Sequence, residues 1–299
     1  MFPEGSEIVL SMVVATLGRS DELSPLLQSL CGQSRRDFEV IVVDQNPDDR
    51  LVPVLASKGA ELNIVHLRTD RHGVCRARNL GAAHARGEWL LFPDDDCWYP
   101  DDFLGRLDAV RASHPADFYS GRAAAPDGRD IMGAFESSAM PITRANVWTT
   151  LIEWMLTVRK AAFTEAGGFD ENIGPGAKTP WGAYEVQDLA LNLLAHGRRG
   201  YYDPSLTGHH PEDLSDRTTA TNIAKMRVYS GGLGYVMRRH GYALPAFLPS
   251  LLRPLAGVAV YTASGKPGMA RRSWQIFLGR WTGWRDAPRP PEPEKARVS

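Results

Sequence analysis

The first third of the chain alternates short apolar runs with stretches of helical periodicity. The apolar runs are nearly continuous, as in parallel strands covered on both faces, and they occupy residues 8–14, 38–43, 63–67 and 88–92. The segments between them place apolar residues at helical spacing and cover residues 20–32, 51–58 and 73–85. This order predicts an α/β fold with a parallel sheet and right-handed crossovers.

Polar residues come directly after these predicted strands. They are Thr16, Asp44, Asp70 and the run Asp94, Asp95, Asp96. In an open parallel sheet, ligands bind beyond the carboxyl ends of the strands. The pattern therefore predicts a binding cleft at this edge of the sheet.

Three consecutive carboxylates at a strand end repel one another unless a cation or a hydrogen-bond network compensates. Oxygen ligands of this kind suit Mg²⁺ or Mn²⁺, which keep open positions for substrate phosphates. Residues 14–19 contain no glycine-rich phosphate loop, so a diphosphate bound here would need such a cation. The alternative is an acidic turn that is merely solvated.

The chain resembles the family 2 glycosyltransferases, which have the GT-A fold, over residues 8–211. That fold is a mainly parallel, Rossmann-like sheet flanked by helices, here with a C-terminal helical extension. The segments that carry the resemblance are VVATLGR (13–19), EVIVVDQN (39–46), GVCRARNLGAAHARGEWLLFPDDD (73–96), TPWGAYEVQDL (179–189), YYDP (201–204) and HHP (209–211).

The resemblance implies roles for individual residues in binding a nucleotide sugar. Asp94 and Asp96 match the D-x-D carboxylates of the family, with Asp96 expected on the metal and Asp95 between them near the nucleotide sugar. His210 matches a histidine that completes the metal or diphosphate site, although a histidine before proline can be an ordinary loop residue. The remaining implied nucleotide contacts are Thr16 in the first loop, Asp44 at the nucleobase, and Arg78, which could equally be a surface arginine.

The resemblance also implies an inverting mechanism, in which a carboxylate takes the proton of the acceptor hydroxyl. The family's usual base position is occupied here by Val186, which cannot accept a proton. Glu185 is then the first choice of base and Asp188 the second, although Asp188 is equally explained as a helix-terminal charge. Trp181 and Tyr184 are expected to stack on an acceptor sugar.

The implied function is transfer of a sugar from a nucleotide-sugar donor to a glycan or lipid-linked acceptor. Polysaccharide, lipopolysaccharide or glycolipid synthesis would use such an activity. Two alternatives remain at this stage. Val186 motivates a non-catalytic nucleotide-sugar or glycan-binding protein, and the metal-binding acids would also suit a sugar nucleotidyltransferase, which wants a more glycine-rich first loop.

The composition limits the partners and the cellular compartment that we expect. With 34 basic and 35 acidic residues, no overall field favours nucleic acid. The cysteines, Cys31, Cys75 and Cys97, lack disulfide or zinc spacing and indicate a reducing compartment. We find no secretory signal and no long uninterrupted apolar stretch, so we expect a cytoplasmic protein.

We expect three parts: a GT-A domain at 1–215, a helical extension at 216–285 and a disordered tail at 286–299. Within the first part, residues 1–100 would form the nucleotide-binding half and residues 101–215 the acceptor half. The extension interleaves arginine and tryptophan beside an apolar stretch broken by prolines. This predicts either an interfacial helix at the inner face of a membrane or a helical appendage that packs on the domain.

Overall fold

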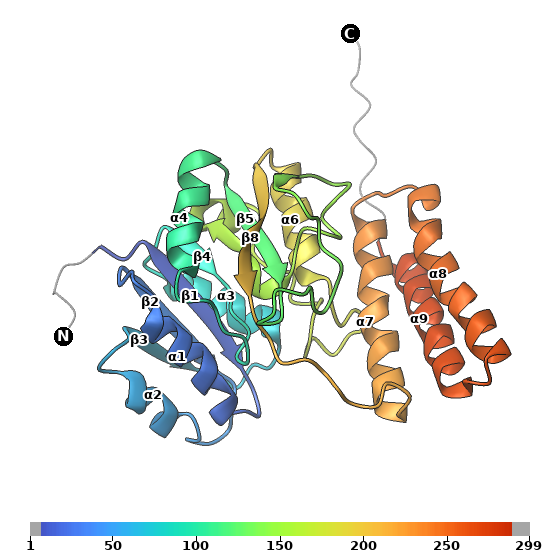
Figure 1. Ribbon diagram of the computed structural model, residues 1–299, viewed down its shortest axis with the longest axis horizontal. Coiled ribbons are helices and arrows are strands. Elements are labelled where there is room, and N and C mark those ends of the chain that lie inside the picture. The colour runs from blue at the N-terminus through green and yellow to red at the C-terminus, as the bar shows by residue number, and fades with distance from the viewer. Residues whose placement is uncertain (1–6, 289–299) are drawn as a thin grey trace, which may run out of the picture. The chain divides into compact units, whose positions relative to one another are not determined.

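The computed structural model describes residues 7–288. Its centre is an eight-stranded sheet with the order β3-β2-β1-β4-β7-β5-β8-β6 (Figure 1). The first half of the sheet is built from the predicted alternation of strands and helices. Its elements are β1 (Leu10–Thr16), η1 (Asp21–Leu23), α1 (Ser24–Gly32), β2 (Phe38–Asp44), α2 (Val52–Lys58), β3 (Ile64–Arg68), α3 (Val74–His84) and β4 (Trp89–Leu91).

The pairs β1–β2, β1–β4 and β2–β3 are all parallel, so the predicted parallel half is confirmed. Strand β2 is buried along its whole length, as expected of a strand covered on both faces. On one face, alternate residues of β1 and β2 join α1 and α4 in the main hydrophobic core. Gly81 of α3 approaches the other face so closely that an added Cβ would lie 2.3 Å from Val13 Cγ1.

The second half of the sheet is mixed. Its elements are α4 (Phe103–Ser113), β5 (Phe118–Ala123), β6 (Met140–Ile142), η2 (Glu153–Met155), β7 (Thr157–Arg159), α5 (Lys160–Glu165), α6 (Glu185–Ala195) and β8 (Gly200–Gly208). Strand β7 pairs antiparallel with both β4 and β5, whereas β5 and β8 are parallel. An antiparallel β7 therefore joins two parallel parts.

The chain divides into two compact units, which we describe separately. The first comprises Met1–Glu171 and Glu185–Asp213, and the second comprises Asn172–Tyr184 and Leu214–Ser299. The division lies close to the expected boundary at residue 215, but the segment Asn172–Tyr184 groups with the C-terminal helices. This segment is tied to them because the Gly182 N–H donates to the Val228 carbonyl at 3.1 Å.

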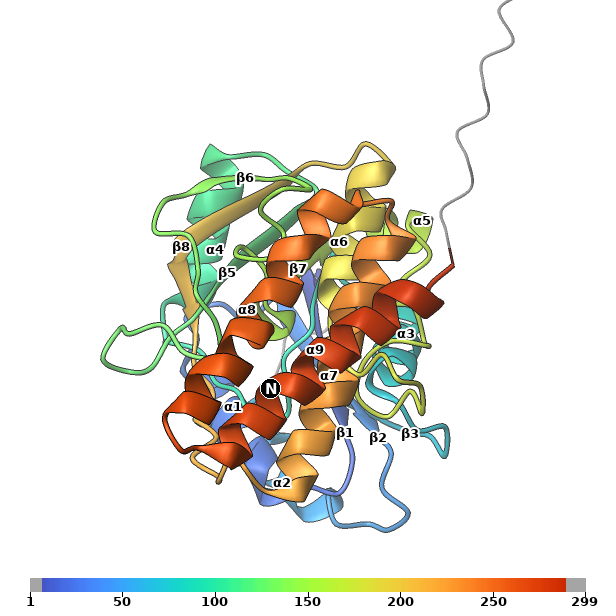
Figure 2. The same ribbon diagram turned by 90° about the vertical axis from the view of Figure 1, so that its right-hand side faces the viewer.

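The second unit contains α7 (Ala220–Arg239), α8 (Leu244–Ala263) and α9 (Pro267–Asp286). Helix α9 lies between α7 and α8 (Figures 1 and 2). All three helices begin within the expected helical extension at 216–285. Helix α9 extends to Asp286, the first residue of the expected tail, and residues 289–299 of that tail lie outside the described residues.

Candidate active site

The carboxyl ends of three parallel strands bring the predicted polar residues to one edge of the sheet. Thr16 ends β1 and pairs in register with Asp44, which ends β2. Asp94 forms a parallel bridge with Ala15. After the Asp94–Asp96 turn, Trp98 pairs antiparallel with His209. This pairing places the next residue, His210, beside the turn.

Asp94, Asp96 and His210 form a cluster that fits a divalent cation. Each offers one ligand atom, and these atoms all lie within 4.8 Å of one another. The set of two carboxylates and one imidazole suits Mg²⁺ or Mn²⁺ and leaves room for oxygen atoms of a substrate. His210 is further held by stacking on Trp154, with ring centroids 4.9 Å apart. The residues that the sequence singled out for metal binding are therefore together.

Arg19 is the counter-charge of the acidic turn. Its Nη1 lies 2.6 Å from Asp95 Oδ1 and 2.5 Å from Asp96 Oδ2. Burial raises the pKa of Asp95, and the charge of Arg19 offsets this only in part. Burial also acts to raise the pKa of Asp96, but the hydrogen bond and charge of His210, together with Arg19, lower it overall.

Arg78 is a buried link between the metal cluster and helix α6. Its side chain is 2% exposed, so the alternative of a surface arginine is wrong. Nη2 donates to Asp94 Oδ1 at 2.7 Å, and Nη1 lies 3.4 Å from Glu185 Oε1. A buried guanidinium between two carboxylates holds both at fixed positions.

The two candidate bases differ in their surroundings. Glu185 is 3% exposed and keeps one carboxylate oxygen, Oε2, without a hydrogen-bond partner among residues 7–288. Burial raises the pKa of Glu185, against the lowering effect of Arg78. Asp188 is completely buried, with Oδ2 lying 3.5 Å from Asn192 Nδ2 one turn later. Both candidate carboxylates are therefore buried, and Val186 lies in the hydrophobic core.

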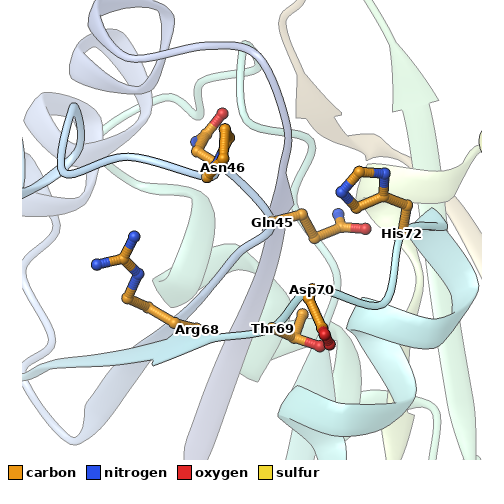
Figure 3. A pocket seen from close by; sticks show the side chains of 7 residues that line it. Gln45, Asn46, Arg68, Thr69, Asp70 and His72 are labelled. Atoms are coloured by element: carbon orange, nitrogen blue, oxygen red, sulfur yellow. The ribbon is translucent and has the colours of Figure 1, made fainter.

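A cavity of about 450 Å³ lies at the ends of β2 and β3 (Figure 3). Figure 3 shows Arg68 at one end and His72 at the other. The lining residues are Gln45, Asn46, Pro47, Arg68, Thr69, Asp70 and His72. The volume is within the range of small-molecule sites, and the cavity includes Gln45 and Asn46, the two residues after Asp44.

Asp44 does not itself line this cavity; it is 1% exposed and engaged within the protein. Its Oδ1 accepts hydrogen bonds from the backbone N–H and Nδ2 of Asn46, at 2.8 and 2.9 Å. Its Oδ2 lies 3.0 Å from His66 Nε2. Asn46 Oδ1 in turn accepts from the Gly18 N–H at 2.6 Å. Asp44 thus positions Asn46 and the first loop, and direct contact with a nucleobase stays a prediction.

The expected acceptor residues belong to the helical unit. Trp181 stacks on Tyr235 of α7, with ring centroids 4.9 Å apart, so one face of its indole is already covered. Tyr184 adopts a positive φ of 78° immediately before α6. Sugar stacking by these two residues stays a prediction.

Two candidate functional residues, Arg19 and Glu153, were not predicted from the sequence. Arg19 lies in the loop after the first strand, where a single arginine carries no motif that marks it as a partner of distant carboxylates. Glu153, in η2, is a partly buried acid whose pKa is raised to about 8 by burial, and by the charges of Glu185 and Asp94. No local pattern marks Glu153, because its acidic neighbours come from distant segments.

The sheet order and the acidic cluster define a GT-A fold. A mannosyltransferase from Pyrobaculum calidifontis, solved with GDP-Man and Mn²⁺, has a TM-score of 0.63 at 18% identity, covering 93% of this chain and 86% of that one. Staphylococcus aureus TarS (residues 1–349) bound to UDP-GlcNAc has a TM-score of 0.54 at 15% identity, covering 94% and 93%. At such low identity these structural similarities establish the fold alone.

The chain belongs to glycosyltransferase family 2. The family model "Glycosyl transferase family 2" matches residues 11–139. An uncharacterized glycosyltransferase of Haemophilus influenzae is 38% identical over 73% of this chain and 74% of its own length. A PGL/p-HBAD biosynthesis glycosyltransferase of Mycobacterium bovis is 35% identical over 38% of this chain. The matched region covers 46% of that relative's length, which is less than half. The fold and family expected from the motifs are thus confirmed.

Proposed function

We propose that this glycosyltransferase moves a sugar from a nucleotide-sugar donor to an acceptor hydroxyl with inversion, in a Mg²⁺- or Mn²⁺-dependent reaction. The observation that carries the proposal is the grouping of Asp94, Asp96 and His210 within 4.8 Å, at the sheet edge that also holds the cavity. The GDP-Man, UDP-GlcNAc and Mn²⁺ bound by the structural neighbours support it.

Each half of the donor has residues suited to it. Asp94, Asp96 and His210 would hold the cation, which when bound neutralises charge that develops on the leaving diphosphate. Arg19 is positioned to turn its guanidinium from the carboxylates to a phosphate oxygen. The cavity beside Gln45, Asn46 and Asp70 would receive the nucleoside, with Thr16 at the entrance to the first loop.

Glu185 is the stronger candidate for the base. Its carboxylate contacts Arg78, which contacts Asp94, so Glu185 is connected to the donor site, whereas Asp188 is enclosed in the domain. The raised pKa of Glu185 increases its basicity once it is ionised. A base on the face opposite the leaving diphosphate gives inversion without a covalent intermediate.

We propose a glycan or lipid-linked acceptor, used in the synthesis of a polysaccharide, lipopolysaccharide or glycolipid. The names of two relatives support this class: the mycobacterial PGL/p-HBAD biosynthesis enzyme and the poly(ribitol-phosphate) β-N-acetylglucosaminyltransferase TarS. A lipid-linked acceptor would be met from the cytoplasm, at the inner face of the membrane. Trp181 and Tyr184 are the proposed acceptor contacts.

A second candidate function is binding of a nucleotide sugar without turnover. Val186 favours it, because the family's usual base position is apolar and buried here. The two candidate functions predict different results when the Glu185 carboxylate is replaced by an amide. Catalysis by Glu185 requires its carboxylate, whereas a binding protein tolerates the amide.

The test is product formation with a panel of UDP- and GDP-sugars, Mn²⁺ and polyprenyl-phosphate or oligosaccharide acceptors, followed by NMR of the new anomeric linkage. We expect inversion, and for Glu185→Gln a loss of kcat of at least about a hundredfold, the lower range for a general base. Asp188→Asn is the matched control. Retention of configuration, or full activity of Glu185→Gln, would contradict this mechanism.

A further inference from the structure

Most of the helical unit, from Arg217 to Arg285, carries charged residues of a single sign. Between Arg217 and Arg285 the sequence has eleven Lys and Arg residues and no Asp or Glu, whereas residues 1–216 have 32 acidic and 20 basic residues. The net charge of −1 for the whole chain therefore conceals a cationic helical segment and an acidic remainder. A segment of this kind is attracted to anionic surfaces.

Helix α8 presents a stripe of exposed apolar residues. Leu244, Leu248 and Leu252 recur at four-residue intervals and lie one above the other, and Val260 continues the stripe two turns later; they are 48%, 42%, 62% and 59% exposed. The packed side of the helix is a different one. There Phe247 stacks on Trp284 of α9 with ring centroids 4.3 Å apart. The stripe thus stays exposed although α8 packs on α9.

Helix α9 adds an aromatic and cationic surface. Trp274 and Trp281 are 42% and 41% exposed and lie seven residues apart, on one face of the helix. Arg271, one turn before Trp274, is also exposed. Tryptophan and arginine in this combination are typical of the membrane–water interface, where the indole sits at headgroup level.

We propose that α8 and α9 form an in-plane docking surface for a membrane rich in anionic lipid. The α8 stripe would enter the acyl-chain boundary, and the arginines and tryptophans would contact the headgroups. The occupant is assigned from charge complementarity, because an acidic lipid surface matches a segment with eleven cations and no carboxylate. For the proposed function, such docking would bring the chain to a lipid-linked acceptor.

The arrangement is in-plane rather than spanning. Among residues 7–288, α8 is the helix that is long and apolar enough to cross a membrane. However, it contains Arg253 and two internal prolines, and it packs along α9. Helix α9 contains four arginines, so a spanning α8 would have to leave its partner or take those charges into the hydrocarbon.

The test uses the full chain and sedimentation with vesicles of phosphatidylglycerol and phosphatidylcholine, or of phosphatidylcholine alone. We expect the wild type to sediment with the anionic vesicles, less at high salt, and little with the neutral ones. Leu248→Gln with Leu252→Gln should lower the partition coefficient at least about tenfold. Arg253→Glu with Arg271→Glu should do the same. Met132→Gln and Arg106→Glu, exposed in the first unit, are the matched controls and should leave sedimentation unchanged.

Three results would overturn the proposal. Absence of sedimentation, or equal sedimentation of wild type and both double variants, would remove the docking surface. A concentration-dependent dimer that the leucine variant loses would assign the stripe to a second copy of the chain. Retention of the protein on vesicles after an alkaline carbonate wash would indicate a spanning helix. Donor turnover measured on the same proteins without vesicles keeps a failure of the proposed function separate from a failure of this surface.

Discussion

Nε2 of His210 lies 2.9 Å from Oδ1 of Asp96, joining the end of β8 to the turn after β4. Burial acts to lower the pKa of His210, but the hydrogen bond to Asp96 and the charge of that carboxylate outweigh it, and the pKa is raised. Without a cation, the protonated form of His210 would compensate the carboxylate. A divalent cation would take over that compensating role.

Removal of either partner should abolish tight metal binding. For Asp96→Ala and His210→Ala we expect Mn²⁺ affinity in the presence of a nucleoside diphosphate to fall more than about tenfold, since even outer-shell changes cost that much. Titration calorimetry measures it. Asp102→Ala, an exposed acid a few residues further on, is the control and should bind as the wild type does. Unaltered affinity in both cluster variants would show that the cluster holds no metal.

Arg19 should compete with the cation when no nucleotide is present. Because its guanidinium contacts both Asp95 and Asp96, Arg19→Ala frees two carboxylates. We expect Arg19→Ala to bind Mn²⁺ alone several-fold more tightly, but the Mn²⁺–nucleoside diphosphate complex more weakly, since a phosphate contact is lost. Electron paramagnetic resonance of free Mn²⁺ reports both affinities. A weaker affinity for Mn²⁺ alone would rule out the competition.

Arg78 should be a strong determinant of stability. Its replacement by methionine leaves Asp94 and the buried Glu185 without their shared cation, which costs about 3–5 kcal/mol of unfolding free energy. Adding Glu185→Gln should restore part of that loss, as measured by urea denaturation. Arg76→Met, two residues earlier in α3, is the control; its partner Glu171 is partly exposed, so we expect a cost below about 1 kcal/mol. Additive losses in the double variant would contradict the coupling.

Glu153 should make stability fall with rising pH. Its pKa is raised from 4.5 to about 8 in the folded protein, by burial and by Glu185 and Asp94. Between those values the folded state binds more protons than the unfolded chain, so the free energy of unfolding decreases as pH rises. Glu153→Gln removes this contribution. It should flatten the pH dependence of the midpoint of urea unfolding, measured in the presence of a metal chelator. The exposed Glu61→Gln should keep the wild-type slope; an unflattened Glu153→Gln profile would be inconsistent with the burial of this charge.

The strands of the parallel half could be predicted because each is a continuous apolar run that ends at a polar residue. Strand β7 could not, since three residues between η2 and α5 carry no periodicity. The metal cluster was predictable through the family motifs that contain Asp94, Asp96 and His210. The Arg78–Glu185 pair was not, because the two residues are 107 positions apart and only the packing of α3 and α6 brings them together.

The base was the least predictable part of the site. Its position in the motif is Val186, and sequence alone ranked Glu185 above Asp188 by spacing. The structure shows that both acids are buried and that Glu185 contacts Arg78, which in turn contacts Asp94. The choice depends on side-chain surroundings that spacing does not encode.

The most direct test of the account is the release of nucleoside diphosphate from a UDP- or GDP-sugar by wild type and Asp96→Ala, with Mn²⁺ and with chelator. We predict release by the wild type that requires the metal, and release by Asp96→Ala at least about a hundredfold slower, the scale on which electrostatic stabilisation of a leaving group acts. Tight donor binding by the wild type without metal-dependent release, over the full donor and acceptor panel, would contradict the account and leave a nucleotide-sugar-binding protein.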